Sequence, residues 1–182
     1  MKTCLSVTLL FLICATNSVF AQHYIPIEQS SSIKFKVSHQ MIFKSTVTGT
    51  FAGLKGSILF DPNNLPSSMF DVSVASETIS SGMGMRDHDL KKEEYFDVKK
   101  YPLIIIKSQT ITKSSNGDGY TFTGTLTMKG ITKTISFPFT ANPVSGGYEF
   151  QGSFQLNRLE YNVGTDNSIN KNVEVDLTVL AK

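Results

Sequence analysis

The densest group of residues able to carry out chemistry is Met85 to Leu90, which holds an arginine, a histidine and two carboxylates. Carboxylates on either side of an imidazole are the components of a metal site or of a general acid–base pair. However, Asp87, His88 and Asp89 are adjacent, and adjacent side chains on a helix point in different directions. Groups that converge on one ion from a helix are spaced three or four residues apart. The spacing therefore favours structural roles, such as helix capping and an ion pair of Arg86, over metal binding.

Two further places offer polar groups for chemistry. His39 ends an alternating apolar stripe, so we expect it in or at the mouth of the interior, bonded to a neighbouring group or to a ligand head group. The stretch from Asn157 to Asn172 is typical of a long loop, and its Asp166 and Asn167 are the alternative of a calcium site. The chain lacks the motifs of serine hydrolases, phosphate loops and zinc peptidases. We therefore expect no enzyme, no metal and no cofactor.

The elements that must position these residues are predominantly strands, because apolar and polar residues alternate along most of the chain. Eight or nine strands joined by short turns predict an all-β closed barrel or a two-sheet sandwich. Ser81 to Tyr95 breaks the alternation and predicts one short helix, capped near Ser80 or Ser81. The alternating segments are Ile33 to His39, Val47 to Phe51, Leu54 to Phe60, Phe70 to Val74, Ile104 to Ile106, Tyr120 to Met128, Ile135 to Phe139, Tyr148 to Leu156 and Val173 to Val179.

Residues 1–21 have the features of a secretory signal peptide: a basic residue at Lys2, an apolar run from Cys4 to Cys14, and a cleavage site after Ala21. The apolar run is shorter than the roughly 20 residues that a membrane-spanning helix needs. We therefore expect a periplasmic or secreted protein without a stable membrane anchor.

Residues 22–182 are then expected to form a single domain. Both cysteines of the chain precede this domain, so disulfides are excluded and the domain must be stabilised by its own core. The 17 basic residues nearly balance the 15 acidic residues. Such a chain has no electrostatic reason to bind nucleic acid or an anionic membrane.

The inward positions of the predicted strands are dominated by phenylalanine and β-branched residues, which is the ordinary composition of a packed core. Glycine also recurs at inward positions, at Gly49, Gly56, Gly124 and Gly152. Small residues there would leave room for a slender ligand inside an eight-stranded barrel. Bends of the strands at barrel corners are the alternative explanation.

A series of short segments gives the chain a family resemblance. They are Ser32 to Phe35 with His39, Val47 to Phe51, Gly56 to Asp61, Arg86-Asp87, Phe96-Asp97, Lys100 to Pro102 and Gly124 to Lys133. In this order, behind a signal peptide, the chain resembles the YceI-like family of exported, lipocalin-like, polyisoprenoid-binding proteins. The resemblance covers essentially all of residues 22–182.

The resemblance implies an extended eight-stranded antiparallel lipocalin-like β-barrel with one short helix beside it. It also implies that the apolar interior binds, transports or stores a long isoprenoid, such as a prenyl phosphate or a quinone tail. One departure lies in the polar group. The family commonly has R-D-x-H-L, whereas this chain has Asp89 at the histidine position and His88 one residue earlier.

Two alternatives remain at this stage. One is an enzyme that acts on an amphipathic substrate in the barrel through His39 and Asp87, and the other is a ligand-free barrel that binds a protein partner. An exposed edge strand could also pair in a homodimer. For the lipid-binding hypothesis, His39 and Arg86 are expected near the polar head group. The expected lining residues are Phe35, Val37, Val47, Phe51, Phe60, Ile104, Ile106, Phe122, Leu126, Phe137, Phe150 and Phe154.

Overall fold

The computed structural model describes residues 22–39, 45–115, 117–165 and 169–182. The predicted signal peptide with both cysteines, Asp166, Asn167 and the side chain of His39 lie outside this description. The strands are β1 (Gln22–Tyr24), β2 (Ser32–His39), β3 (Thr46–Phe51), β4 (Lys55–Phe60), β5 (Met69–Ala75), β6 (Leu103–Lys113), β7 (Tyr120–Met128), β8 (Ile131–Val144), β9 (Gly147–Asn157) and β10 (Ile169–Ala181). The helices are η1 (Glu28–Ser30), η2 (Leu65–Ser67), η3 (Ser76–Thr78), α1 (Gly84–Leu90) and η4 (Arg158–Tyr161).

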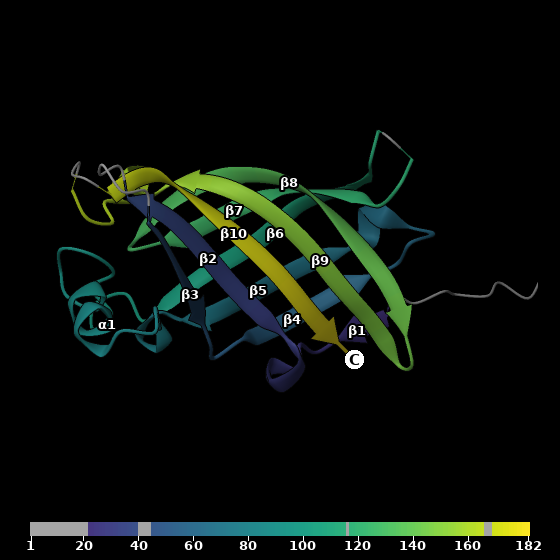
Figure 1. Cartoon of the computed structure of the whole chain (residues 1–182). Helices are drawn as coiled ribbons and strands as arrows, with labels where there is room; N and C mark the ends of the chain where they lie inside the picture. The colour runs from purple at the N-terminus through teal and green to yellow at the C-terminus, as the bar shows by residue number, and fades with distance from the viewer. Residues whose placement is uncertain (1–21, 40–44, 116, 166–168) are drawn as a thin grey trace, which may run out of the picture.

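The strands form one curled antiparallel sheet in the order β1-β4-β5-β6-β7-β8-β9-β10-β2-β3 (Figure 1). The all-β class and the lipocalin-like architecture are as expected, but ten strands correct the number of eight. The nine alternating segments of the sequence correspond to β2 through β10. The additional strand, β1, has three residues. It is too short to show a periodicity and exists because it pairs with β4.

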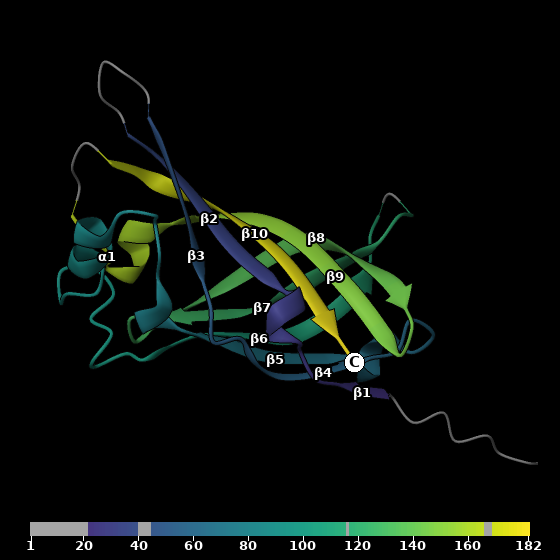
Figure 2. The ribbon, with the colours of Figure 1, turned by 60° about the horizontal axis from the view of Figure 1, so that its bottom comes forward.

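The chain after β1 bridges the sheet at the end that holds the C-terminus. The Ile25 and Ile27 amides donate to the Lys182 and Leu180 carbonyls, each at 2.7 Å. This segment thereby links β4, through β1, to β10. Helix α1 lies at the opposite end of the curled sheet (Figures 1 and 2). There β3 is bonded to the segment before α1: the Thr50 amide donates to the Ser80 carbonyl at 2.8 Å, and the Ser80 amide donates to the Thr50 carbonyl at 3.0 Å.

Helix α1 is shorter than the predicted span from Ser81 to Tyr95, and turns follow it. Its N-cap is Met83, which makes no side-chain capping bond, so the prediction of a cap near Ser80 or Ser81 is wrong. The Ser81 hydroxyl instead donates to the Asp87 carboxylate and accepts from Arg86. Ser81 thus fastens the loop before the helix to side chains within it.

The interior is filled unevenly along the strands. Residues of β7 alternate between buried and half-buried over the whole strand, so its inward side chains are all covered. On β10, Val179 and Ala181 near the C-terminus are buried, whereas Val173, Val175 and Leu177 are only half-buried. The sheet therefore encloses a packed interior at the C-terminal end and an open one at the α1 end.

Candidate ligand-binding site

A cavity of about 280 Å³ occupies the α1 end of the sheet. Its volume is near the lower limit of small-molecule sites, which have roughly 300–1,000 Å³. Inward aliphatic and aromatic side chains of β2, β3, β5, β6, β7, β9 and β10 form most of the wall, and α1 contributes Arg86 and Leu90. Phe35 and Phe51, which pack at a centroid distance of 5.6 Å, are part of this wall. The site is therefore an apolar pocket with the helix at its rim.

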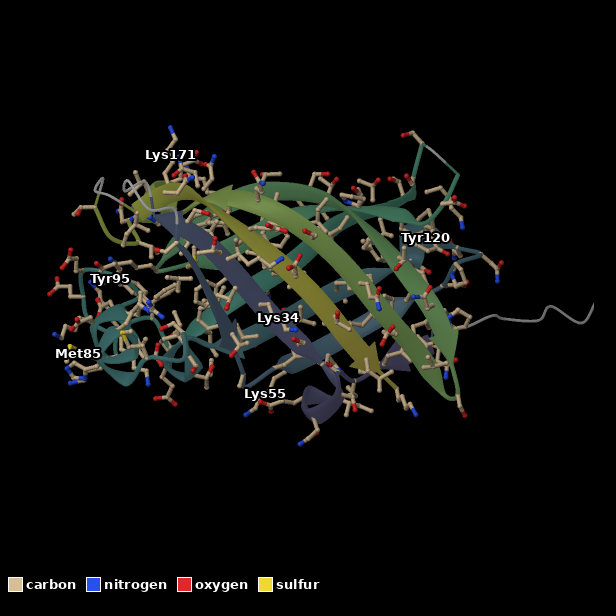
Figure 3. The ribbon with its side chains drawn as sticks, viewed as in Figure 1. Lys34, Lys55, Met85, Tyr95, Tyr120 and Lys171 are labelled. Carbon is tan, nitrogen blue, oxygen red and sulfur yellow. The ribbon has the colours of Figure 1, made fainter. Side chains whose placement is uncertain are left out.

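The opposite end of the sheet is filled by aromatic rings. Phe60 is 1% exposed and packs its ring against Phe70, Tyr120, Tyr148 and Phe150 at centroid distances between 5.1 and 6.2 Å. These contacts are edge-to-face, which is a favourable arrangement of aromatic pairs. Figure 3 labels Tyr120 at this end, and Met85 and Tyr95 at the other. The aromatic cluster thus closes the interior far from α1.

The structure divides the expected lining residues into two groups. Phe60, Phe122, Phe137 and Phe150 do not line the cavity, which corrects their assignment, because they lie on strand segments that face the aromatic cluster. The backbone of His39 ends β2, but its side chain is not described. The residues that do line the cavity are Phe35, Val37, Val47, Phe51, Arg86, Ile104, Ile106, Leu126 and Phe154. Their contact with a ligand stays a prediction.

The inward glycines do not create the open space. A side chain at Gly49 would collide with the Phe35 ring, and one at Gly124 would collide with the Phe122 ring and the Lys107 carbonyl. Gly56 faces backbone of the neighbouring strand at a φ of 140°. These glycines allow rings and backbone to approach closely, and none of them lines the cavity.

The charged residues that border the cavity are Lys34, Arg86 and Arg158. Lys34 alternates on β2 with the inward Ile33 and Phe35, so its side chain lies on the outer face and the cations of the inner wall are the two arginines. Among the described residues, no carboxylate shares this wall. Arg86 donates from Nε to the Ser81 hydroxyl at 2.7 Å and from Nη2 to the Ser81 carbonyl at 2.8 Å. An apolar pocket with positive charge alone on its wall is suited to an apolar chain that ends in a neutral or anionic head group.

Asp87 is held close to this arginine but does not line the cavity. Its carboxylate accepts from the Ser81 hydroxyl and, at 2.7 Å, from the Ser81 amide. The hydroxyl, the amide and the Arg86 charge lower the pKa of Asp87. These bonds support the structural role predicted for the polar group, and they give no support to Asp87 as an acid or base in the barrel.

Arg158 is a residue of the site that sequence reasoning missed. It is 6% exposed, and its guanidinium donates to the Val163, Thr165 and Ile169 carbonyls at 2.8–2.9 Å. It thus ties the ends of the connection between β9 and β10 to the cavity wall. A single arginine directly after a strand, at the start of a loop rich in Asn and Gly, was the available signal.

The remaining members of the polar group face solvent. Asp89 forms an exposed ion pair with Lys92 at 2.6 Å, and His88 is exposed. The family histidine position is therefore occupied here by a surface carboxylate. Within the described ranges, no three His, Cys, Asp or Glu side chains are grouped to hold a metal ion. The helices in those ranges include none with the length and apolar character needed to cross a membrane.

Comparison with known proteins identifies the family of the sequence. The model of the YceI-like domain matches residues 25–181. The UPF0312 protein YE1254 of Yersinia enterocolitica is 28% identical over 187 residues, which cover 98% of this chain and 95% of that protein.

Solved structures share the fold. BcnA of Burkholderia cenocepacia superposes with a TM-score of 0.77 at 25% identity, over 85% of this chain and 98% of that chain. A polyisoprenoid-binding domain from Saccharophagus degradans, implicated in plant cell wall breakdown, gives a TM-score of 0.68 over 87% of this chain and 97% of its own. That domain is 14% identical, so the likeness concerns the fold alone.

Proposed function

Because the chain belongs to the YceI-like family, we propose that it binds an isoprenoid chain or a similar amphipathic lipid and carries or stores it unchanged. The observation that carries this proposal is the apolar cavity at the α1 end, whose wall has cations and, in the described part of the chain, no carboxylate. An apolar chain fits such a wall, and the cations suit a phosphate or another electron-rich head group. The family resemblance points to the same ligand class.

The affinity of the site comes mainly from the burial of hydrocarbon. Each CH₂ removed from water contributes about 0.8 kcal/mol. Association costs roughly 4–15 kcal/mol in lost freedom of motion, so several isoprene units must enter the cavity before binding is tight. Ile104, Ile106, Val173, Val175 and Leu177 are half-buried in the free protein and offer the surface that a ligand would cover.

Arg86 is the best-placed contact for the head group. Its Nε and Nη2 groups are fixed by Ser81, and among the described residues nothing accepts from Nη1. A guanidinium fixed in this way can donate to a phosphate oxygen without losing further side-chain freedom.

The direct test is recovery of the natural ligand. The protein would be purified without detergent from the compartment to which its own cells export it, and native mass spectrometry and organic extraction would follow. We expect a bound lipid, and uptake of a fluorescent prenyl probe after its removal. Ligand-free protein that also fails to take up the probe would refute the proposal.

A further inference from the structure

We infer that a row of three stacked phenylalanines ends the cavity and limits the length of the chain that it accepts, an inference that rests on the proposed function. Phe154 on β9 lines the cavity. The Phe137 ring on β8 stacks on it at 4.9 Å, and the Phe122 ring on β7 stacks on Phe137 at 4.8 Å. Neither Phe137 nor Phe122 reaches the cavity. On the wall made by β7, β8 and β9 the open space therefore stops at the first ring of the row, whereas along β10 it reaches Val179, the partner of Phe150 in the aromatic cluster.

The row is held firmly in place. Phe122 and Phe137 are direct partners in the pairing of β7 with β8, and all three rings are at most 9% exposed. Gly152 has no side chain, which lets the Phe137 ring lie against β9. Behind the row, Phe70 meets Phe122 edge-to-face at 6.3 Å and continues into the aromatic cluster. A ligand chain thus meets packed rings instead of a continuous pore.

The depth of the open part sets the expected limit. On β10, Val173 and Val179 both line the cavity. Six residue steps along a strand cover roughly 20 Å. A strand tilt of about 35–45° reduces this to roughly 15 Å along the barrel axis. Four carbon–carbon bonds of about 1.5 Å make an extended isoprene unit roughly 5 Å long. The site should therefore hold about three units, with a fourth at the mouth, and is suited to short prenyl chains.

Phe137→Ala tests the row, and Phe139→Ala is its matched control. Both residues lie on β8, face inward and are 6% exposed. Phe137 stacks on Phe154, whereas Phe139 stacks on Tyr120 at 5.4 Å inside the aromatic cluster. Removal of either ring leaves a similar void, but Phe137 is the one of the two that stacks on the cavity-lining Phe154, whose ring can turn into the void at position 137.

The experiment measures binding of linear prenols of two, three, four, six and nine isoprene units by displacement of a fluorescent prenyl probe. In the wild-type protein, affinity should rise at least about tenfold for each added unit up to about four units and then level off, because the burial of five carbons outweighs the cost of ordering them. Phe137→Ala should move this plateau to a longer prenol, and Phe139→Ala should leave it in place.

The outcomes separate the two proposals. Affinity that keeps rising beyond four units in the wild type, or a plateau that Phe137→Ala and Phe139→Ala shift alike, would overturn the length limit while leaving lipid binding intact. Absence of binding for every prenol would overturn the proposed function and the length limit with it. If Phe137→Ala does not fold, Phe137→Leu removes the stacked ring but retains apolar volume, and the same shift of the plateau is expected.

Discussion

At the rim of the cavity, Ser81 connects the two charged side chains that the sequence places next to each other. It bonds both to Arg86, on the cavity wall, and to Asp87, which faces away from it. Because the bonds to Asp87 hold the loop against the helix, they also fix the base from which Arg86 extends. The carboxylate therefore acts on the site by positioning a neighbour.

Asp87→Asn should lower the melting temperature at neutral pH. The pKa of Asp87 is lowered below its ordinary value of 3.8 by the Ser81 hydroxyl first. A lowered pKa means that the ionised form stabilises the fold above pH 3.8, and that this stability is lost as the pH falls through the lowered pKa. Melting curves between pH 7 and pH 2 should show the gap to wild type closing at the acidic end.

Asp89→Asn is the control for that series, because Asp89 lies on the same helix and forms an exposed ion pair with Lys92. Its effect should be smaller than that of Asp87→Asn. A gap between wild type and Asp87→Asn that is equally wide at pH 2 and pH 7 would contradict the role given to the carboxylate.

Arg158→Met should destabilise the protein strongly. Hydrogen bonds to charged groups contribute about 1.5–3 kcal/mol each, and the substitution removes a buried bond to the Val163 carbonyl and part-buried bonds to the Thr165 and Ile169 carbonyls. We expect a loss of at least about 3 kcal/mol in the free energy of unfolding. In a domain of this size that corresponds to roughly 6–12 °C in melting temperature. Lys171→Met, which removes an exposed cation on nearby β10, should change it by less than about 2 °C. Equal effects of the two substitutions would show that the Arg158 bonds contribute little.

At the scale of single strands, β6 passes from the open part of the interior to the packed part. Ile106 lines the cavity and is half-buried, whereas Ile111 is 4% exposed and pairs with Phe122. The register shift between Ser108 and Thr110 separates the two. The same residue type therefore meets free space at one position and close packing at the other.

The substitutions Ile106→Phe and Ile111→Phe test this difference between free space at position 106 and close packing at position 111. At position 106 the larger side chain should enter the cavity, so the melting temperature should stay within about 2 °C of wild type, while binding of a fluorescent prenyl probe weakens at least about tenfold. At position 111 overpacking should cost about 1–3 kcal/mol. Thermal melting and probe titration of both variants provide the check. An Ile106→Phe protein that binds the probe normally would place the ligand elsewhere.

The sequence predicts the strands well because alternation is a local property. Phe35, Val37 and Ile106 are correctly expected to point inward, as are Phe122 and Phe137. Alternation predicts on which face of the sheet a side chain lies. It does not predict which side chains of the opposite wall lie next to it in the interior. Phe122 meets Phe137 and Phe70 there, whereas Ile106 borders the open cavity. The site therefore depends on sheet curvature and register, which single strands do not encode.

For a similar reason, local sequence patterns predicted neither where α1 ends nor that β1 exists. Residues Lys91 to Tyr95 belong to the segment predicted as a helix, yet they form turns, and Tyr95 and the following Phe96 line the cavity. Burial of these rings is a tertiary gain that outweighs helix propensity. β1 is stabilised by β4, a partner more than 30 residues away in the chain.

For the whole molecule, the two ends of the sheet should differ in how readily they open. The C-terminal end has the aromatic cluster and the bridge from β1 to β10, whereas at the α1 end the cavity leaves inward side chains with fewer neighbours. Segments with little buried apolar contact open with lower free energy than the core. The α1 end, where a ligand must enter, should therefore also have the lower free energy of local opening.

A ligand should stabilise the molecule mainly at that end. At a free prenyl ligand concentration of 100 times the dissociation constant, binding adds about 2.7 kcal/mol to the free energy of unfolding. That corresponds to a rise of roughly 5–11 °C in melting temperature. Amide hydrogen exchange should slow most in β2, β3 and the part of β10 around Val175, and least in the β8–β9 hairpin around Gly147, which lies beyond the aromatic cluster. Exchange that slows first around Gly147, or equally at both ends, would mean that the ligand does not occupy the cavity beside α1. Ile106→Phe, with this cavity filled, should abolish the end-specific protection while its own exchange at the β8–β9 hairpin stays that of the wild type.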